Sequence, residues 1–441
     1  MQSLGDTLKS KLRPKETAPR LSKSMRHCSD QSKSFLESSS GSVRFPGSRK
    51  KPAKFCHVPV DASVEEDLVP LLIKSWGLRP PDAIISIPPA RGCTRDDVFR
   101  HDHKAELIFT RGLAEAARTT GAWVMTGGLE NGVAALVGRA LQDTDSPTIG
   151  FCAHTNVQNN DVLVGGQSGV VHYSPLTVVR DEAATVPLSR LDALHSHFVL
   201  VDDGSADGQA GERKLRGQLE RYLCEHDVSG DGVKTPMVLF VINGDVESLL
   251  WVIEALEPQS SESIHDSPSK RARRLAPSVS SVCSTRPVLV MADSGGAAED
   301  IFNYINQEAR QLPDPERRSE EYCTQAELLL PRILELGQIT ALNKTPPLSF
   351  FSLSEDASIG HDHLALMLQR ALQNDCNDSQ ERVLLSVAWG EPLILRDVLE
   401  KSGEESSDDS SGRVGLQSTT RQPLPVAPLA RSRTVAERSP L

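Results

Sequence analysis

Four short segments rich in glycine and small polar residues each follow a stretch that reads as a buried strand. They are Thr126–Gly127–Gly128, Asp202–Asp203–Gly204–Ser205, Asn243–Gly244–Asp245 and Asp293–Ser294–Gly295–Gly296. Glycine lets a backbone approach a phosphate closely, and the N-terminus of a following helix offers unpaired N–H groups and a partial positive charge. Together these segments could cradle a nucleotide, although a glycine at a strand-to-helix junction is by itself usually only a turn.

The spacing of other motifs disfavours several enzyme classes. No GxGxxG follows a strand and no GxxxxGK[ST] is present, which argues against a nicotinamide enzyme and a P-loop ATPase. The run Asp293–Ser294–Gly295–Gly296 superficially resembles a serine-protease nucleophile loop, but no His and Asp context supports a triad. The sequence therefore predicts no catalytic residues.

Two His-Asp-His runs have the composition of metal ligands but the wrong spacing. They are His101–Asp102–His103 and His361–Asp362–His363. On a helix, side chains two residues apart point in different directions, so we expect these runs to cap helix starts and to bind no metal. The eight cysteines include no CxxC pair, which predicts reduced thiols without a disulfide framework or a zinc site.

Continuous apolar stretches alternate with amphipathic helical stretches from residue 55 to about residue 310. The expected strands are 82–87, 122–126, 148–153, 197–202, 237–242 and 287–291, and the expected helices are 61–75, 101–120, 130–141, 211–224, 245–256 and 297–305. This pattern is typical of a doubly wound, mostly parallel α/β sheet covered on both faces. In such a sheet, ligands bind at the carboxyl ends of the strands, where strand order switches, and all four glycine-rich segments belong to that edge.

The remaining segments have other compositions. Residues 1–54 hold thirteen Lys and Arg against four Asp and Glu, a charge of +9, and lack periodicity, so we expect them to be disordered. We also expect a disordered Ser/Pro-rich insertion at 258–286, which contains the basic cluster 270–274, and a disordered tail at 402–441. A basic head can contact anionic lipid or acidic partners, although it is more simply a solvated tail.

After Pro315 the pattern changes to helices only, at 319–336, 361–373, 381–388 and 392–401. Paired short helices suit an ankyrin-like or armadillo-like stack, which binds other chains. The expected domains are thus the α/β unit at 55–310 and a helical segment at 311–401. No run of about 18 apolar residues exists, so no membrane span is expected, and nothing indicates secretion.

Several motifs, in order along residues 55–400, resemble the N-terminal homology region of TRPM cation channels. The run WGLRPPDAIIS at 76–86 is similar to the start of that region, and TTGAWVMTGG at 119–128 followed by Gly132, Val133, Val137 and Gly138 is similar to its most telling motif. HSHFVLVDDG at 195–204, the helix after it at 214–220, the segment 287–300 and LLSVAW at 384–389 follow in family order.

The resemblance implies a Rossmann-like SLOG or LOG fold at the cytosolic base of a tetrameric, Ca2+-permeable channel. In some members this domain binds ADP-ribose in the cleft at the strand ends. The resemblance therefore implies an ADP-ribose-like nucleotide as the candidate ligand. It implies no required cofactor. Carried over to this sequence, the residues facing that cleft would be Thr126, Gly127, Gly128, Asp202, Asp203, Gly204, Arg216, Ser294 and Gly295.

Two departures from the family pattern weaken the ligand hypothesis. The family's first Gly-Gly loop is here Pro88–Pro89, which lacks two N–H donors, and the arginine of its GSGR run is here Gly296. The PGGxGTxxE loop of the free-standing LOG hydrolases is also absent.

Three hypotheses therefore remain open from the sequence. The first is a ligand-sensing or assembly region of a TRPM-like channel, whose pore is absent from this chain and whose partners are other channel subunits. The second is a LOG-type nucleotide-binding or nucleotide-hydrolysing enzyme, and the third is a soluble interaction scaffold without ligand. The first places the chain on the cytoplasmic side of the plasma membrane, the others in the cytoplasm, and none involves nucleic acid.

Overall fold

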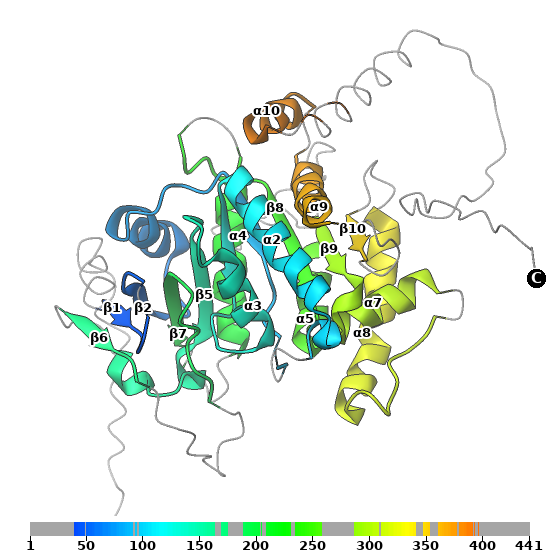
Figure 1. Cartoon of the computed structure of the whole chain (residues 1–441), viewed down its shortest axis with the longest axis horizontal. Coiled ribbons are helices and arrows are strands. Elements are labelled where there is room, and N and C mark those ends of the chain that lie inside the picture. The colour runs from blue at the N-terminus through cyan, green and yellow to red at the C-terminus, as the bar shows by residue number, and fades with distance from the viewer. Residues whose placement is uncertain are drawn as a thin grey trace, which may run out of the picture.

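The computed structural model describes residues 39–390, with gaps at 49, 91–92, 95–96, 164–168, 175–187, 203, 205–208, 231–233, 258–285, 308–309, 341–346, 353–359 and 377–378, together with residues 392 and 396. The described residues form a single ten-stranded sheet with helices on both faces (Figure 1). Its strands are β1 (Ser40–Arg44), β2 (Ala53–Pro59), β3 (Ala83–Ser86), β4 (Ala122–Thr126), β5 (Thr148–Ala153), β6 (Val170–His172), β7 (His197–Asp202), β8 (Met237–Ile242), β9 (Val288–Met291) and β10 (Leu348–Phe351).

The strand order is β10-β9-β8-β3-β4-β5-β7-β2-β1-β6, and each neighbouring pair is parallel except β1 with β2. This arrangement confirms the predicted doubly wound, mostly parallel sheet. Four of the expected strands, β4, β5, β7 and β8, have the predicted boundaries, because their residues are apolar on both faces and therefore stand out in the sequence.

The helical elements are α2 (His103–Thr120), α3 (Gly132–Leu141), α4 (Gln209–Glu225), α5 (Val246–Leu256), α7 (Gly296–Asn306), α8 (Glu320–Thr340), α9 (His361–Asn374) and α10 (Ser379–Trp389), with short helical turns η1 (Val64–Leu68), η2 (Leu71–Ser75), η3 (Phe99–His101), η4 (His154–Asn156), η5 (Asn160–Leu163) and η6 (Ala292–Ser294). The expected helix at 61–75 is present as η1 and η2. Most other helix boundaries fall within two residues of the prediction, as is usual for helix ends.

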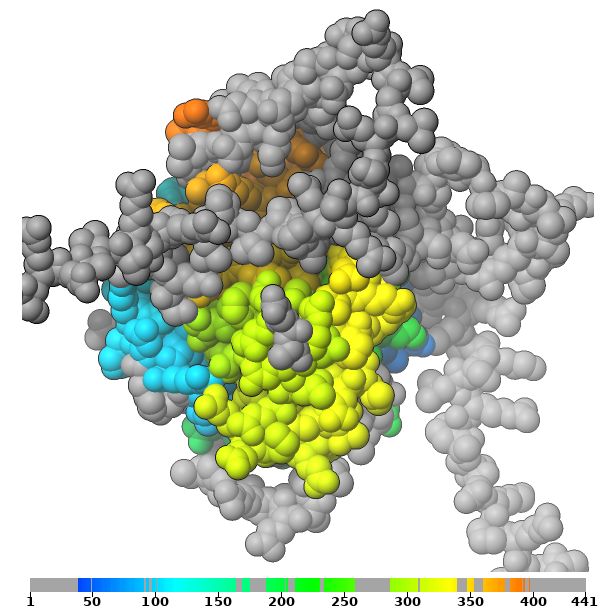
Figure 2. Space-filling model, turned by 90° about the vertical axis from the view of Figure 1, so that its right-hand side faces the viewer, coloured from blue at the N-terminus to red at the C-terminus, as the bar shows by residue number. Residues whose placement is uncertain are grey.

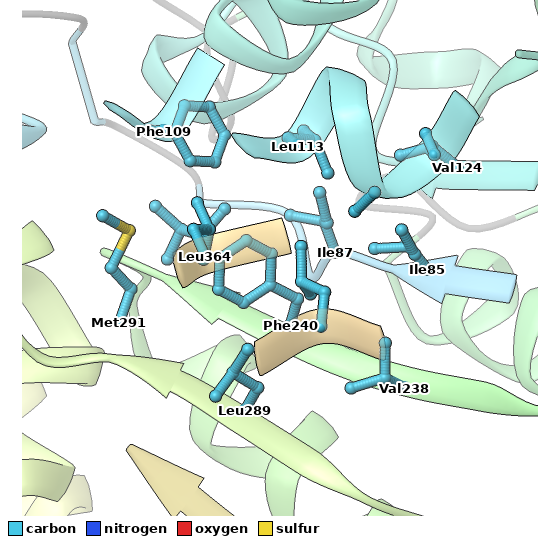
Figure 3. Packing of buried hydrophobic residues seen from close by; sticks show 14 of the residues in the cluster. Ile85, Ile87, Phe109, Leu113, Val124, Val238, Phe240, Leu289, Met291 and Leu364 are labelled. Carbon is cyan, nitrogen blue, oxygen red and sulfur yellow. The ribbon is translucent and has the colours of Figure 1, made fainter. Parts of the chain in front are cut away.

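One face of the central strands is covered by α2, α3 and α9. Phe109 and Leu113 of α2 and Leu364 of α9 pack on inward-facing residues of β3, β8 and β9, including Ile85 and Phe240 (Figure 3). Burying each of these side chains contributes about 1.5–3 kcal/mol. The helix α9 approaches α2 closely because residue 112 is glycine: a Cβ there would lie 2.8 Å from Leu364 Cβ.

The opposite face is covered by η1, η2, α4, α5, α7 and α8. Alternate residues of the same strands, such as Ile84, Trp123 and Leu239, point to this side. The helix α8 lies against α5 and buries Tyr322 and Leu330 there. Figure 2 shows α7 and α8, in yellow-green and yellow, together on the end of the molecule where the sheet finishes at β10.

Two predictions about the ends of the domain are wrong. Strand β1 lies inside the 1–54 segment that was expected to be disordered; its Ser/Gly-rich sequence hides it, since Val43 is its only buried residue. Strand β10 interrupts the region after Pro315 that was expected to hold helices only. It escapes sequence analysis because it has four residues and is defined by pairing with β9.

The helices α8 and α9 belong to opposite faces of the sheet, so they do not form a stacked ankyrin-like or armadillo-like pair. The strand β10 lies between them in the chain and carries the backbone across the sheet edge. The helix expected at 392–401 is represented by Pro392 and Arg396 alone, both helical. The expected insertion 258–286, apart from Arg286, its basic cluster and the tail 402–441 lie outside the described residues.

Among the described residues, no helix combines the length and the apolar character needed to cross a bilayer. No disulfide links the described cysteines.

Candidate ligand-binding site

The carboxyl edge of the sheet is not level. Ser86, the last residue of β3, aligns with Met125 of β4 and with Leu239 of β8, so β8 continues three residues further, to Ile242. On the other side Met125 aligns with Ile149, and β5 continues four residues further, to Ala153. At about 3.3 Å per residue, the edge is indented by roughly 10–13 Å at β3 and β4. We call this indentation the β3–β4 notch.

The notch coincides with the topological switch point of the sheet. Strand β3 leads to α2 on one face, whereas its neighbour β8 leads to α5 on the other. Divergent connections from adjacent strands leave a crevice between them, which is where ligands bind in open α/β sheets. The predicted segments therefore do share one edge, as expected from the sequence.

They do not lie at the same level of that edge. Thr126 aligns with Gly150 of β5, which aligns with Phe198 of β7, so Asp202 lies four residues beyond Thr126 and two strands away. This offset is about 13 Å along the strands. Thr126, Gly127 and Gly128 consequently form the floor of the notch, while Asp202 and Ser294 belong to its two walls.

Glycine is required at the floor. Gly128 has a φ of +68°, and a Cβ there would lie 2.6 Å from Gly150 Cα, so β4 and β5 meet by backbone contact. A Cβ on Gly127 would lie 3.0 Å from Pro89 Cβ. The amide of Gly128 donates to Thr126 Oγ1 at 2.9 Å, so that N–H is bonded within the protein.

Pro88 and Pro89 continue the chain from β3 and are both buried beside the floor. Neither has an N–H to offer a phosphate. Pro89 O accepts a bond from Ser248 Oγ of α5 at 3.3 Å, which ties the β3 loop to the opposite face. The proline pair thus acts in packing where the related family pattern has glycines.

Arg216 of α4 lies directly beneath the floor and is fully buried. Its Nη2 donates to Ser86 Oγ at 2.7 Å and to the carbonyls of Ile87 and Met125, both at 3.0 Å. Its Nε donates to Glu220 Oε1 at 2.9 Å. The guanidinium therefore joins the ends of β3 and β4, and only its Nη1 lacks a hydrogen-bond partner among the described residues.

Two partners of Arg216 were not predicted from the sequence. Glu220 is also fully buried, and its other oxygen lies 3.6 Å from Arg286 Nη1. The ring of Trp251 lies 4.7 Å from the Arg216 guanidinium carbon, a cation–π contact. Arg216 and Glu220 are four residues apart on one helix, a spacing from which an ion pair can be predicted in the sequence. Trp251 belongs to another helix, so no sequence pattern predicts its contact with Arg216.

Ser294 belongs to the wall of the notch on the β8 and β9 side, where its hydrogen bonds link the ends of these two strands. Asn243 N donates to Ser294 Oγ at 2.7 Å, and Ser294 Oγ donates to Met291 O at 2.6 Å. Asn243 Nδ2 also donates to Ser294 O at 2.8 Å. The hydroxyl of Ser294 is therefore bonded on both sides within the backbone, in an arrangement unlike that of an activated nucleophile.

The helix N-termini of this wall are already occupied. Asp245 caps α5 by accepting from Glu247 N at 3.0 Å and Ser248 N at 3.3 Å. The first turn of α7 donates to the β8 loop, with Ala297 N to Gly244 O at 3.0 Å and Ala298 N to Asn243 O at 2.9 Å. A phosphate would find these donors engaged.

Gly295 and Gly296 both have positive φ, +82° and +58°. A Cβ on Gly296 would lie 2.5 Å from Gly244 O, so this position cannot carry the arginine of the related family pattern without moving the β8 loop. The glycine is explained by the close approach of the two loops.

The second wall carries a histidine pair that was not predicted. The rings of His57 and His154 are stacked with centroids 4.3 Å apart, and His57 Nε2 lies 3.5 Å from Asp202 Oδ2. Burial and the neighbouring His154 lower the pKa of His57, and Asp202 opposes that shift. Asp202 Oδ1 also accepts from Gly204 N at 3.0 Å, while Asp203 lies outside the described residues.

The His-Asp-His runs are found at helix starts. Asp102 caps α2 by accepting from Lys104 N at 2.9 Å and Ala105 N at 3.2 Å, which confirms its predicted capping role. At α9, Gly360 N donates to His363 Nδ1 at 3.3 Å. Within the described part of the chain, no group of three or more His, Cys, Asp or Glu side chains is arranged to hold a metal ion.

Residues 53–264 match a protein-family model described as SLOG in TRPM. The chain is 32% identical over 227 residues to transient receptor potential cation channel subfamily M member 2 from Rattus norvegicus, covering 49% of this chain and 14% of the relative. It is 31% identical over 290 residues to subfamily M member 7 from Homo sapiens, covering 62% and 13%.

A third relative, subfamily M member 4 from Rattus norvegicus, is 25% identical over 380 residues, covering 81% of this chain and 28% of the relative. The chain thus spans less than a third of the length of these curated relatives. The match to the family model, the parallel sheet and the order of the motifs all support the same resemblance. Residues 53–264 of this chain are therefore similar to the N-terminal SLOG-like region of TRPM proteins.

Proposed function

We propose that this chain is the cytosolic N-terminal region of a TRPM-like, Ca2+-permeable cation channel, and that its α/β domain serves there in ligand sensing and subunit assembly. Its relatives named above are cation channels, and the chain aligns with a small part of each. The pore, and with it the membrane, would belong to a part of the channel outside this chain.

The sensing part of the proposal concerns an ADP-ribose-like nucleotide in the β3–β4 notch. The observation that carries it is Arg216, whose buried Nη1 has no hydrogen-bond partner among the described residues. An unsatisfied buried donor of a charged group is costly, and a phosphate oxygen would satisfy it. A Cβ at residue 127 or 128 would meet Pro89 or Gly150, so the loop needs glycine at both positions.

A second candidate function is assembly without a ligand. It is favoured by the engaged N–H groups at the starts of α5 and α7, which leave few donors for a phosphate. A hydrolytic function has less support, because the hydroxyls of Thr126 and Ser294 are bonded within the protein.

Calorimetric titration of the full chain with ADP-ribose separates sensing from assembly alone. We expect saturable binding in the micromolar range, about −8 kcal/mol. Arg216→Lys keeps the charge but loses the forked donors, and it should weaken binding. Arg213→Lys is the matched control, because Arg213 lies on the same helix and pairs with Glu247 at 2.7 Å.

Absence of heat and of a thermal shift up to about millimolar ADP-ribose would rule out the sensing part. Sedimentation velocity of the same chain then tests assembly. A concentration-dependent oligomer would support the scaffold, and a strict monomer that also ignores ADP-ribose would contradict both roles.

A further inference from the structure

Four hydrogen bonds close a ring around the floor of the notch. Gly128 N donates to Thr126 Oγ1 at 2.9 Å, and Thr126 Oγ1 lies 2.6 Å from His195 Nε2. His195 Nδ1 lies 2.6 Å from Asp192 Oδ2. Asp192 N donates back to Gly128 O at 2.9 Å, so the ring begins and ends at the same glycine.

The surroundings determine the direction of each bond. The carboxylate of Asp192 can only accept, so His195 Nδ1 carries the proton and donates to it. In the neutral imidazole, His195 Nε2 is then an acceptor, and the Thr126 hydroxyl donates a hydrogen bond to it. The hydroxyl oxygen remains free to accept from Gly128 N, and each donor in the ring meets one acceptor.

This ring is buried and sterically defined. The side chain of His195 has no solvent exposure and that of Asp192 is 7% exposed. A Cβ on Gly138 of α3 would overlap Asp192 Oδ2, which explains a glycine in the middle of that helix. Next to the ring, Glu130 N donates to Arg190 O at 2.6 Å, so the segment before β7 runs alongside the floor loop.

We infer that Asp192 and His195 are positioning residues that set the conformation of the Thr126–Gly127–Gly128 loop at the floor of the notch. Both polar backbone groups of Gly128 are bonded within the ring, the N–H to Thr126 and the carbonyl to Asp192. Gly127, between Thr126 and Gly128 in the loop, stands against Pro89, where a Cβ on it would lie 3.0 Å from Pro89 Cβ. Neither Asp192 nor His195 needs to touch a ligand for this role.

The effect on a ligand rests on the proposed function. Loss of the ring would free the Gly127–Gly128 peptide to rotate, and a phosphate site beside this loop would lose its fixed geometry. We therefore expect variants of the ring to bind ADP-ribose at least about tenfold more weakly than the wild-type chain.

The test measures the loop directly, independent of any nucleotide. Hydrogen exchange of the full chain, read on peptides that contain Gly128, is compared for two pairs of variants. Thr126→Val removes the hydroxyl and keeps the side-chain shape, while Thr126→Ser keeps the hydroxyl. His195→Asn removes the acceptor that faces Thr126, while His197→Gln alters the neighbouring histidine, which bonds Ser196 Oγ at 2.8 Å and takes no part in the ring.

Thr126→Val and His195→Asn should speed exchange of the Gly128 amide by about tenfold or more, and Thr126→Ser and His197→Gln should leave it within about twofold of wild type. Equal exchange in all four variants would overturn the inference. The nitrogen NMR shifts of His195 in the unmutated chain give a second reading that needs no variant to fold. They should report a proton on Nδ1 and none on Nε2, and the opposite tautomer would also overturn it.

A wild-type chain that fails to bind ADP-ribose would remove the proposed ligand and leave the exchange and tautomer results unchanged. The two hypotheses therefore fail separately.

Discussion

A guanidinium with no solvent exposure is expensive to bury unless its charge and its donors are matched. The Arg216 guanidinium forms an ion pair with Glu220 and packs its planar face against Trp251. Its Nη2 donates to two carbonyls and a hydroxyl. The residue thus supports the fold by joining the ends of β3 and β4. Any ligand that recruits its Nη1 would be held by a group that is already oriented.

His197 shows how burial links a single side chain to pH. Burial, followed by the charge of Lys54, lowers the pKa of His197 to about 4 from its usual value near 6.5. The unfolded chain therefore binds the proton more readily than the folded one. The stability associated with neutral His197 is present above about pH 6.5 and is lost as the pH falls toward 4.

We predict that the free energy of unfolding falls by roughly 1–3 kcal/mol between pH 7 and pH 4.5 because of this residue. Urea denaturation of the wild type and of His197→Gln at both pH values measures the difference between them. His226→Gln is the control, since His226 is exposed and should keep the wild-type pH dependence. A His197→Gln variant with the wild-type loss of stability at low pH would refute the prediction.

At the scale of elements, the loops after β8 and β9 behave as one unit. They share the bonds of Asn243 with Ser294 and those of the α7 N-terminus with Gly244 and Asn243. With these hydrogen bonds formed, Gly296 has a left-handed conformation and lies against the backbone of Asn243 and Gly244. These hydrogen bonds hold the two loops against each other.

We predict that Gly296→Ala lowers the free energy of unfolding by about 2–4 kcal/mol, from left-handed strain and from overlap with Gly244 O. Gly337→Ala in α8 should instead raise it by about 0.5–1 kcal/mol, because helix interiors prefer alanine. The nearest atom to a Cβ at 337 is Leu348 Cδ2, at an ordinary 3.8 Å. Chemical denaturation of both variants checks the contrast, and equal effects would contradict it.

At the scale of the whole molecule, the α/β domain continues past residue 310. Strand β10 completes the sheet beside β9, α8 covers α5, and α9 packs on α2 at Gly112. The buried residues of α8 and α9 include Leu330, Ile333, Leu364 and Leu368. Cutting the chain at the expected boundary would therefore expose apolar surface on both faces of the sheet.

We predict that a chain ending at residue 310 does not unfold cooperatively, whereas a chain ending at residue 396 does. The longer chain keeps every described element, while the shorter one loses cover for α2 and α5 and should aggregate. Thermal melting followed by circular dichroism, together with gel filtration, measures both. A sharp transition and a monomeric peak for the shorter chain would restore the boundary at 310.

The sequence by itself determined most of the helices and six of the strands, in their order along the chain. Apolar runs such as Met237–Ile242 predict buried strands, and Asp102 predicts the start of the helix that it caps. Both features can be predicted because they depend only on residues close together in the sequence. The family motifs pointed to Thr126, Gly127 and Gly128 as one loop of the candidate site. In the structure this loop lies at the carboxyl edge of the sheet, directly after β4. Short strands such as β10 carry no local signal, since pairing alone defines them.

Only the tertiary structure decided which of these residues meet. The stagger of the strands, set by packing between distant segments, places Thr126 and Asp202 at different levels. It also buries Arg216 under the floor and brings Asp192 to His195 and Gly128. Register and burial depend on contacts between elements far apart in the chain, and no local pattern encodes them.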